Sequence, residues 1–143
     1  MVRRWMVPLL IAVTGAAIAA RQFVTGSPVA GAVLGLLFGL LAVTQSPLAF
    51  PRSIEAAEAQ RRAAEDGKPI VYWRPGCPFC LRLRARLGPS GARRAHWVDI
   101  WRDPDGAAAV RAITGGDETV PTVVIGGSSH VNPDPNWLRR QIA

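Results

Sequence analysis

Two long stretches without a charged residue open the chain, the first over residues 5–20 and the second over residues 28–50. A helix needs roughly twenty apolar residues to cross the hydrocarbon core of a bilayer, so the first stretch is short and the second is adequate. Arginine side chains at the ends of a short span can extend to the membrane surface, which makes the first stretch tolerable. The pattern predicts a transmembrane helical hairpin over residues 1–51, with helices at about 5–22 and 28–46.

Ser27 and Pro28 mark the start of the second helix, because serine caps helices and proline suits the first helical position. The preceding loop, residues 21–27, is short, so the two helices must run antiparallel. Small residues recur every four positions on both helices, at Gly31, Gly35 and Gly39 and at Ala12, Ala16 and Ala20. Such spacing lets helices approach closely in lipid. We expect the two helices to pack on each other, with association between copies of the chain as the alternative.

Charged residues divide the chain at Pro51. All ten acidic residues follow it, and the first 50 residues carry only Arg3, Arg4 and Arg21. Cytoplasmic segments of membrane proteins are enriched in Lys and Arg, and here arginines precede the first helix and follow the second. This predicts a multi-pass protein of the cell membrane with both ends, and the domain after Pro51, in the cytoplasm. The alternative is a cleaved signal peptide ending near Ala17-Ile18-Ala19, which would place the domain outside.

Residues 53–66 are rich in helix formers and precede Gly67, which predicts a linker helix over residues 52–67 with Ser53 as its cap. Strands and helices then alternate over residues 68–143. A strand is expected at 68–73, followed by a helix that ends at Gly88-Pro89.

A second strand is expected over residues 95–101, which completes a parallel βαβ unit. Asp103 should cap a helix over residues 103–114. The β-branched residues 122–125 predict a strand, with an antiparallel partner around residues 129–131.

A last helix is expected from about residue 135 to residue 142, capped by Asn132 or Asp134. The order β-α-β-α-β-β-α predicts an α/β fold with a mixed four-stranded sheet, preceded by the two transmembrane helices.

Cys77 and Cys80 are the only cysteines, and they follow the first predicted strand. Two cysteines separated by two residues at a strand-to-helix turn are typical of a dithiol redox site. A helix N-terminus favours the thiolate of Cys77, whereas Cys80 lies one turn further on and stays a thiol. The pattern predicts Cys77 as the nucleophile and Cys80 as the resolving thiol.

Two other uses of the same cysteines remain open. A zinc site would need two further ligands, and the chain offers only His96 and His130, distant from each other and from the cysteines in sequence. A static disulfide would close so short a loop that it would stabilise the fold little.

Arg74 and Arg82 are the cations expected near Cys77, where they could hold the thiolate or a substrate carboxylate. Trp73, Trp97 and Trp101 are expected to be packing groups.

The motifs of this domain resemble those of the glutaredoxin family, above all its actinobacterial mycoredoxin-type members. They are Cys77-Pro78-Phe79-Cys80, Val98-Asp99-Ile100 with Asp103-Pro104, Gly115-Gly116, Thr119-Val120-Pro121-Thr122-Val123-Val124 and Asn132-Pro133. The resemblance covers roughly residues 68–143 and implies a thioredoxin-like (glutaredoxin) fold. It implies that Pro121 is a cis-proline facing the cysteines and that Val120 offers its backbone to an incoming peptide. With the two arginines, the predicted substrate-binding residues are Arg74, Phe79, Arg82, Thr119, Val120 and Pro121.

The chain departs from classical glutaredoxins at two places. Arg74 stands where they carry a lysine. Gly126-Gly127-Ser128-Ser129, leading to Asn132-Pro133, stands where they carry a glycine-rich segment with an acidic pair that grips the amino end of glutathione. By this resemblance the partner thiol is mycothiol, with glutathione as the alternative.

We therefore expect a membrane-tethered thiol-disulfide oxidoreductase with no bound cofactor and with mycothiol or glutathione as co-substrate. Its expected partners are oxidised or thiolated proteins and the lipid bilayer; no basic stripe interleaved with aromatic residues indicates nucleic acid. Two alternative functions are an exported thioredoxin-like thiol oxidase or isomerase and a non-catalytic metal or Fe–S carrier module.

Overall fold

The computed structural model describes the backbone of residues 3–142 and the side chains of residues 5–142. The side chains of Arg3 and Arg4, on which part of the topology prediction depends, lie outside this described part. The chain forms two compact units that divide between Ala49 and Phe50.

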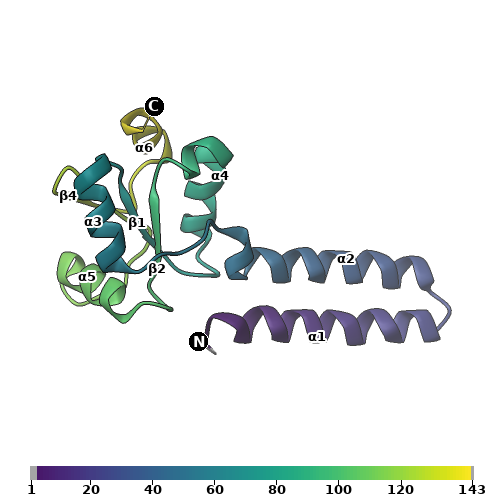
Figure 1. The fold of residues 1–143 in the computed structure, drawn as a ribbon. Coiled ribbons are helices and arrows are strands. Elements are labelled where there is room, and N and C mark those ends of the chain that lie inside the picture. Colours follow the sequence, from purple (N-terminus) through teal and green to yellow (C-terminus); the bar gives the residue numbers. More distant parts are fainter. Residues whose placement is uncertain (1–2, 143) are drawn as a thin grey trace. The chain divides into compact units, whose positions relative to one another are not determined.

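The first unit contains two antiparallel helices, α1 (Arg3–Val24) and α2 (Pro28–Thr44), followed by a short 3-10 turn, η1 (Pro47–Ala49) (Figure 1). Residues Trp5–Val24 of α1 are long and apolar enough to cross a membrane, with a mean hydropathy of 1.7 over their most apolar window. The predicted second helix is shorter than expected. It ends at Thr44, whose hydroxyl donates to the Leu41 carbonyl, and its 17 residues fall below the length of a full span.

Small residues bring the two helices of the first unit together. A side chain added at Gly15 would overlap Phe38, and one added at Gly31 would lie 3.0 Å from the Ala19 carbonyl oxygen. Gly39, by contrast, has open space around it. The contact therefore uses part of the predicted glycine groove and leaves its C-terminal end uncovered.

The second unit is an α/β domain whose elements follow the predicted order. Its helices are α3 (Ala56–Asp66), α4 (Pro78–Ala92), α5 (Pro104–Thr114) and α6 (Pro135–Gln141). Its strands are β1 (Ile70–Trp73), β2 (His96–Asp99), β3 (Thr122–Ile125) and β4 (Ser128–Val131). The strands form one sheet in the order β2-β1-β3-β4, with β1 and β2 parallel and the other pairs antiparallel. This confirms the predicted mixed four-stranded sheet, and the arrangement fits the thioredoxin-like fold.

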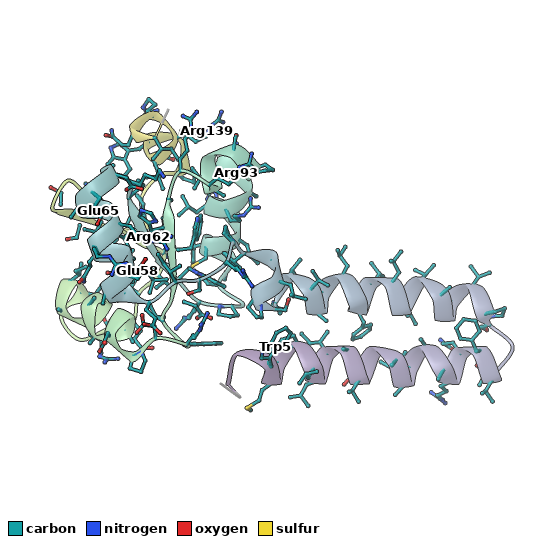
Figure 2. All side chains as sticks on the ribbon, in the orientation of Figure 1. Trp5, Glu58, Arg62, Glu65, Arg93 and Arg139 are labelled. Carbon is teal, nitrogen blue, oxygen red and sulfur yellow. The ribbon has the colours of Figure 1, made fainter. Side chains whose placement is uncertain are left out.

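Helices cover both faces of this sheet. α4 and α6 pack together on one face, and α3 and α5 pack together on the other (Figure 1). All four residues of the central strand β1 are buried. On the face that carries α4 and α6, Leu83 of α4 and Leu138 of α6 are buried as well. The acidic side chains of Glu58 and Glu65 project from α3 on the opposite side (Figure 2).

The domain begins at Phe50, which packs on the α4 side of the sheet. The side chain of Trp97 points to that side, as shown by the hydrogen bond that its indole nitrogen donates to the Ala92 carbonyl at the end of α4, at 2.8 Å. Val71 is its register partner in β1, and Trp73, two residues further, faces the same way because strand side chains alternate. The Phe50 ring stacks on Trp73 with 3.9 Å between centroids. Residues 50–55, predicted to belong partly to the membrane unit and partly to the linker helix, are therefore part of the second unit, and Phe50 belongs to its core.

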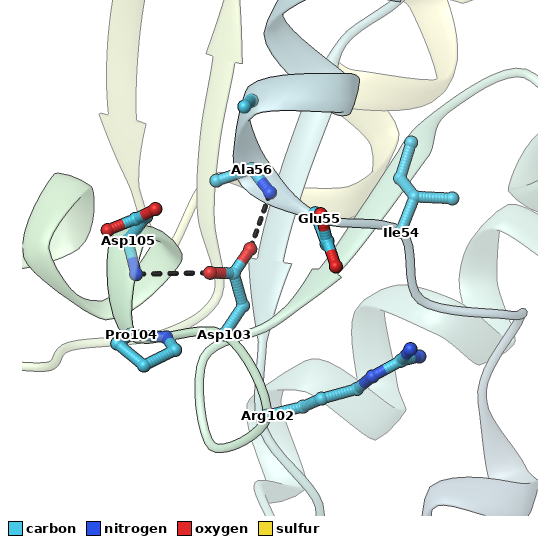
Figure 3. Close-up of a pocket in the computed structure, with 8 residues that line it drawn as sticks. Ile54, Glu55, Ala56, Arg102, Asp103, Pro104 and Asp105 are labelled. Carbon is cyan, nitrogen blue, oxygen red and sulfur yellow. Dashed lines mark hydrogen bonds between the residues drawn. The ribbon is translucent and has the colours of Figure 1, made fainter.

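The predicted cap of the linker helix is wrong. α3 begins at Ala56, and Ser53 instead accepts a hydrogen bond from the Asp99 amide with its hydroxyl oxygen at 2.8 Å. The carboxylate at the N-terminus of α3 comes from Asp103, which accepts from the Ala56 amide at 2.5 Å and from the Asp105 amide at 3.0 Å (Figure 3). One buried side chain therefore caps two helices, α5 as predicted and α3 in addition.

The helical backbone of α4 is interrupted at Gly88, where the sequence predicts its end. Gly88 has a φ of 66°, which glycine adopts without a steric penalty, and Pro89 then starts a further helical turn that runs to Ala92. This additional turn after the kink was not predicted. α6 is capped by Asp134, one of the two predicted caps, which accepts from the amides of Asn136 and Trp137.

Candidate active site

Cys77 is the N-cap residue of α4, at the end of the short turn that follows β1. Gly76 supplies the positive φ that this turn needs, and Pro78 occupies the first helical position. The Cys77 sulfur accepts a hydrogen bond from the Cys80 amide at 3.2 Å and, in its thiol form, donates to the Val120 carbonyl at 3.4 Å. Both cysteines are free thiols. The spacing of the motif therefore places the first sulfur at the helix N-terminus, in contact with the loop before β3.

The two thiols have opposite acidities. The hydrogen bond that the Cys80 thiol donates to the Cys77 sulfur lowers the pKa of Cys77 most; backbone amides and the charge of Arg74 lower it further, and the pKa falls to about 6 although burial opposes the shift. Burial raises the pKa of Cys80 far above its ordinary value, and the neighbouring Cys77 adds to the increase. The pair thus holds one thiolate at neutral pH, on Cys77.

A loop that ends in a cis-proline faces this thiolate. The peptide bond between Val120 and Pro121 is cis, and both residues are buried, whereas Thr119 just before them is exposed. Phe79, the residue between the two cysteines that is not a proline, exposes 54% of its surface. The exposed phenyl ring and the loop before β3 are therefore the surfaces that an incoming chain would meet beside Cys77.

Arg74 and Trp101 form a second edge of the site. The Arg74 guanidinium carbon lies 5.7 Å from the centroid of the Trp101 ring, within the range of a cation–π contact. Trp101 was expected only as a packing group, yet it is partly exposed. A parallel βαβ unit could have predicted this proximity. Trp73 of β1 pairs in parallel with Asp99 of β2, so the residues that follow the two strands emerge at the same end of the sheet.

Of the other residues singled out in the sequence, Asn132 lies beside the site, whereas Arg82 and the segment 126–129 do not contact Cys77. Arg82 is exposed on α4 and is not among the groups that lower the pKa of Cys77. The segment Gly126-Gly127-Ser128-Ser129 forms the turn into β4, at the far end of β3 from Pro121. Asn132 instead lies beside the site, because its amide donates to the Pro121 carbonyl at 2.7 Å.

Two hollows open elsewhere on the domain. One, of about 290 Å³, lies where α3 and α5 begin, and Asp103 and Arg102 are among its lining residues (Figure 3). The other, of about 200 Å³, lies between α4 and α6. Neither contains a cysteine, so the reactive sulfur lies outside both. Within residues 5–142 no three His, Cys, Asp or Glu side chains gather in a way that could hold a metal ion.

The acidity of Cys77 can be measured directly. We expect its alkylation by iodoacetamide to follow a titration with a midpoint near pH 6, where an ordinary cysteine titrates near pH 8.5. Cys80→Ala should raise the midpoint, because it removes the strongest hydrogen bond to the Cys77 sulfur, while Cys80→Ser keeps a donor there and should shift it less. Mass spectrometry of the modified peptide gives the rate at each pH. An unchanged midpoint in Cys80→Ala would contradict this role of Cys80.

The comparisons with known proteins agree with this geometry. No curated protein matches the chain. The family model described as glutaredoxin matches residues 70–131, from the first residue of β1 to the last of β4. This segment includes both cysteines, Arg74 and the cis-proline, and the predicted resemblance is confirmed at the level of the family. The match is to part of the α/β unit, and a glutaredoxin-like domain is consistent with thiol-disulfide chemistry.

Proposed function

We propose that this protein is a membrane-anchored thiol-disulfide oxidoreductase that reduces protein disulfides and the mixed disulfides of proteins with a small thiol, mycothiol in first place. The observation that carries the proposal is the Cys77 sulfur at the N-terminus of α4, with a pKa of about 6 and the backbone of Val120 beside it. A thiolate held at neutral pH next to a backbone edge can attack a disulfide that docks along that edge.

The first step is a thiol exchange. The Cys77 thiolate attacks the sulfur of the small thiol in a mixed disulfide, a new disulfide forms between them, and the protein thiolate leaves and takes up a proton. In the one-cysteine route a second molecule of the small thiol, as its thiolate, attacks the small-thiol sulfur of the new disulfide. This releases the Cys77 thiolate and the oxidised dimer of the small thiol.

The second route uses Cys80. Its thiol must lose a proton and attack the Cys77 sulfur, which releases the small thiolate and leaves a disulfide between the two cysteines for an external thiol to reduce. Burial, the largest cause of the raised pKa of Cys80, persists in the mixed disulfide and slows this attack. Once Cys77 is part of a disulfide its negative charge is gone, and that contribution to the raised pKa goes with it.

Mycothiol is proposed over glutathione for two reasons. The motifs resemble mycoredoxin-type glutaredoxins, and the position next to Pro121 is held by Asn132, where an acidic pair would be expected for the amino group of glutathione. Arg74 and Trp101 offer a cation and a flat ring to a small polar thiol at the opposite edge.

The proposed anchor is the helical hairpin of the first unit. Residues Trp5–Val24 meet the length and hydropathy of a span, and α2 would reach across with help from the apolar residues that follow it. Arginines before the first helix and after the second, against Arg21 alone in the loop between them, support a cytoplasmic domain. A reporter fused after Ala143 that is active only inside the cell supports this topology, whereas one active outside would favour the exported oxidase or isomerase.

The small thiol is identified by competition between two adducts. The full chain in detergent is offered one peptide carrying either mycothiol or glutathione on its single cysteine, with the matching free thiol as reductant. We expect faster release of the peptide from the mycothiol adduct, with Cys80→Ser retaining that preference. No release from either adduct, together with reduction of an ordinary protein disulfide that needs both cysteines, would overturn the proposal in favour of a thioredoxin-like dithiol reductase.

A further inference from the structure

The charges of the domain are sorted by the two faces of the sheet. From Gly67 to Val98 the sequence carries seven basic residues and no acidic one, and five of the seven belong to α4 and the turn after it. α6, which packs on α4, adds Arg139 and Arg140 in its last turn. In Figure 2, Arg93 and Arg139 lie at the same end of the domain, on the side of α4 and α6.

The opposite face is mixed and internally paired. On α3 both Arg61 and Arg62 pair with Glu58, and Arg111 in the last turn of α5 pairs with Glu118 at 2.7 Å. Among the described side chains, no arginine of α4 or α6 forms an ion pair with an acidic group. The acid nearest in sequence to Arg139 and Arg140 is Asp134, which is already bonded to the first amides of α6. The cations on one face are thus neutralised within the fold, and those on the other are not.

A shallow hollow lies in the middle of the unpaired cations. It has a volume of about 200 Å³ and lies between α4 and α6, with Arg94 and Arg139 on its rim and Leu87 and Ile142 below. Arg94 donates to the Ile142 carbonyl at 2.8 Å, which fixes one guanidinium at this position. A guanidinium has further donors and keeps its charge at any physiological pH, so it suits phosphate oxygens.

The domain begins on the α4 side of the sheet, at the end of β1 that precedes Arg74 and the cysteines. Phe50, which directly follows the first unit, stacks on Trp73 on the α4 side of the sheet. Only a few residues separate the end of α2 from the domain. With the first unit anchored in the membrane, this short connection keeps lipid headgroups at a high effective concentration around the domain. An anionic lipid surface attracts nearby arginines within about one Debye length.

We propose that the α4–α6 face, defined by Arg86, Arg93, Arg94, Arg139 and Arg140, docks on the anionic phospholipid headgroups of the membrane that holds the anchor. The inference rests on the membrane anchor of the proposed function and adds an orientation to it. The loop before β3 and the edge formed by Arg74 and Trp101 lie beyond the N-terminal end of α4, so docking through the later turns of α4 and through α6 leaves the cysteines accessible to protein substrates.

The test uses the full chain in nanodiscs of phosphatidylcholine, with or without about 30% phosphatidylglycerol, and follows backbone hydrogen exchange by mass spectrometry. In the anionic nanodiscs, at about 0.05 M salt, we expect the backbone amides of residues 84–94 and 135–142 to exchange at roughly one third of their rate in phosphatidylcholine nanodiscs, or more slowly still. The difference should vanish at about 0.5 M salt, where surface charges are screened.

Charge variants separate the face from overall charge. Arg86→Gln, Arg93→Gln and Arg139→Gln together should abolish the lipid-dependent protection, while Arg61→Gln, Arg62→Gln and Arg111→Gln together, which remove the same charge from the other face, should retain it. Arg94 is left unchanged because it bonds to the fold. Equal exchange in both lipids, equal loss in both triple variants, or protection by duplex DNA but not by lipid would each overturn the docking surface.

Failure of the anchor is distinguished by an alkaline carbonate wash of vesicles carrying the chain. A chain that resists the wash but shows no lipid-dependent protection overturns the docking alone. A chain that the wash removes overturns the anchor, and flotation at neutral pH with phosphatidylglycerol vesicles against phosphatidylcholine vesicles then decides the docking. Retention on the anionic vesicles alone would support it, and no retention would overturn it.

Discussion

Cys77→Ser is expected to reduce the rate of mixed-disulfide reduction roughly a thousandfold or more, to the level of the uncatalysed thiol exchange. A serine hydroxyl does not ionise near neutral pH, and oxygen cannot replace sulfur in thiol-disulfide exchange. None of the contacts that lower the pKa of Cys77 can compensate, because they act on the group that has been removed. The measurement is release of the unmodified peptide from its small-thiol adduct by the full chain in detergent.

The matched variant is Cys80→Ser, which keeps a hydrogen-bond donor toward the Cys77 sulfur. In the one-cysteine route it should retain most of the parent rate on the small-thiol adduct and lose the reduction of disulfides that need an internal resolving thiol. Equal loss in both variants would show that resolution by Cys80 is obligatory. Full activity of Cys77→Ser would place the nucleophile elsewhere.

Trp73→Ala is expected to cost about 3–5 kcal/mol of the free energy of unfolding of the domain, a large part of the 5–15 kcal/mol that a typical domain has. Trp73 is 1% exposed, lies on the central strand and stacks on Phe50. Its removal leaves a cavity that the rigid sheet cannot close. Hydrogen exchange of the β1 and β3 amides in the full chain reports the loss without depending on tryptophan fluorescence.

The control is Trp73→Phe. The indole nitrogen of Trp73 is buried with no hydrogen-bond partner in the described part of the chain, so the smaller phenyl ring of phenylalanine removes an unsatisfied donor. This gain offsets part of the lost volume, and the net change should stay within about 1.5 kcal/mol. A loss as large as that of the alanine variant would mean that the indole nitrogen has an acceptor.

Elements governed by neighbouring residues could be predicted from the sequence. β3 spans the β-branched residues Thr122–Ile125 as expected, and α5 starts after Asp103 and ends at Gly115 because its cap and its left-handed terminus are adjacent to it in sequence. The start of α3 could not be predicted in this way. Its capping carboxylate, Asp103, is 47 positions away from Ala56, and only the packing of α3 against α5 brings the two together.

In the candidate site, too, the local features could be predicted from the sequence and the long-range contacts could not. The place of Cys77 at a helix N-terminus follows from local residues, namely the strand before it and Pro78 after it. The hydrogen bond to Val120 and the contact of Arg74 with Trp101 link segments that are distant in sequence, and they depend on strand order and register. Residues that follow two adjacent parallel strands, as Arg74 and Trp101 do, therefore meet at one end of the sheet although they are distant in sequence.

The stacking of Phe50 on Trp73 decides where the protein can be cut. A recombinant domain that begins at Arg52, the first residue after the apolar segment, would lack this ring and would expose one face of the Trp73 indole to water. Starting two or more residues earlier retains the ring at the expense of a few apolar residues. Poor solubility or low activity of a fragment cut at Arg52 would then reflect a missing piece of the core rather than a need for the membrane.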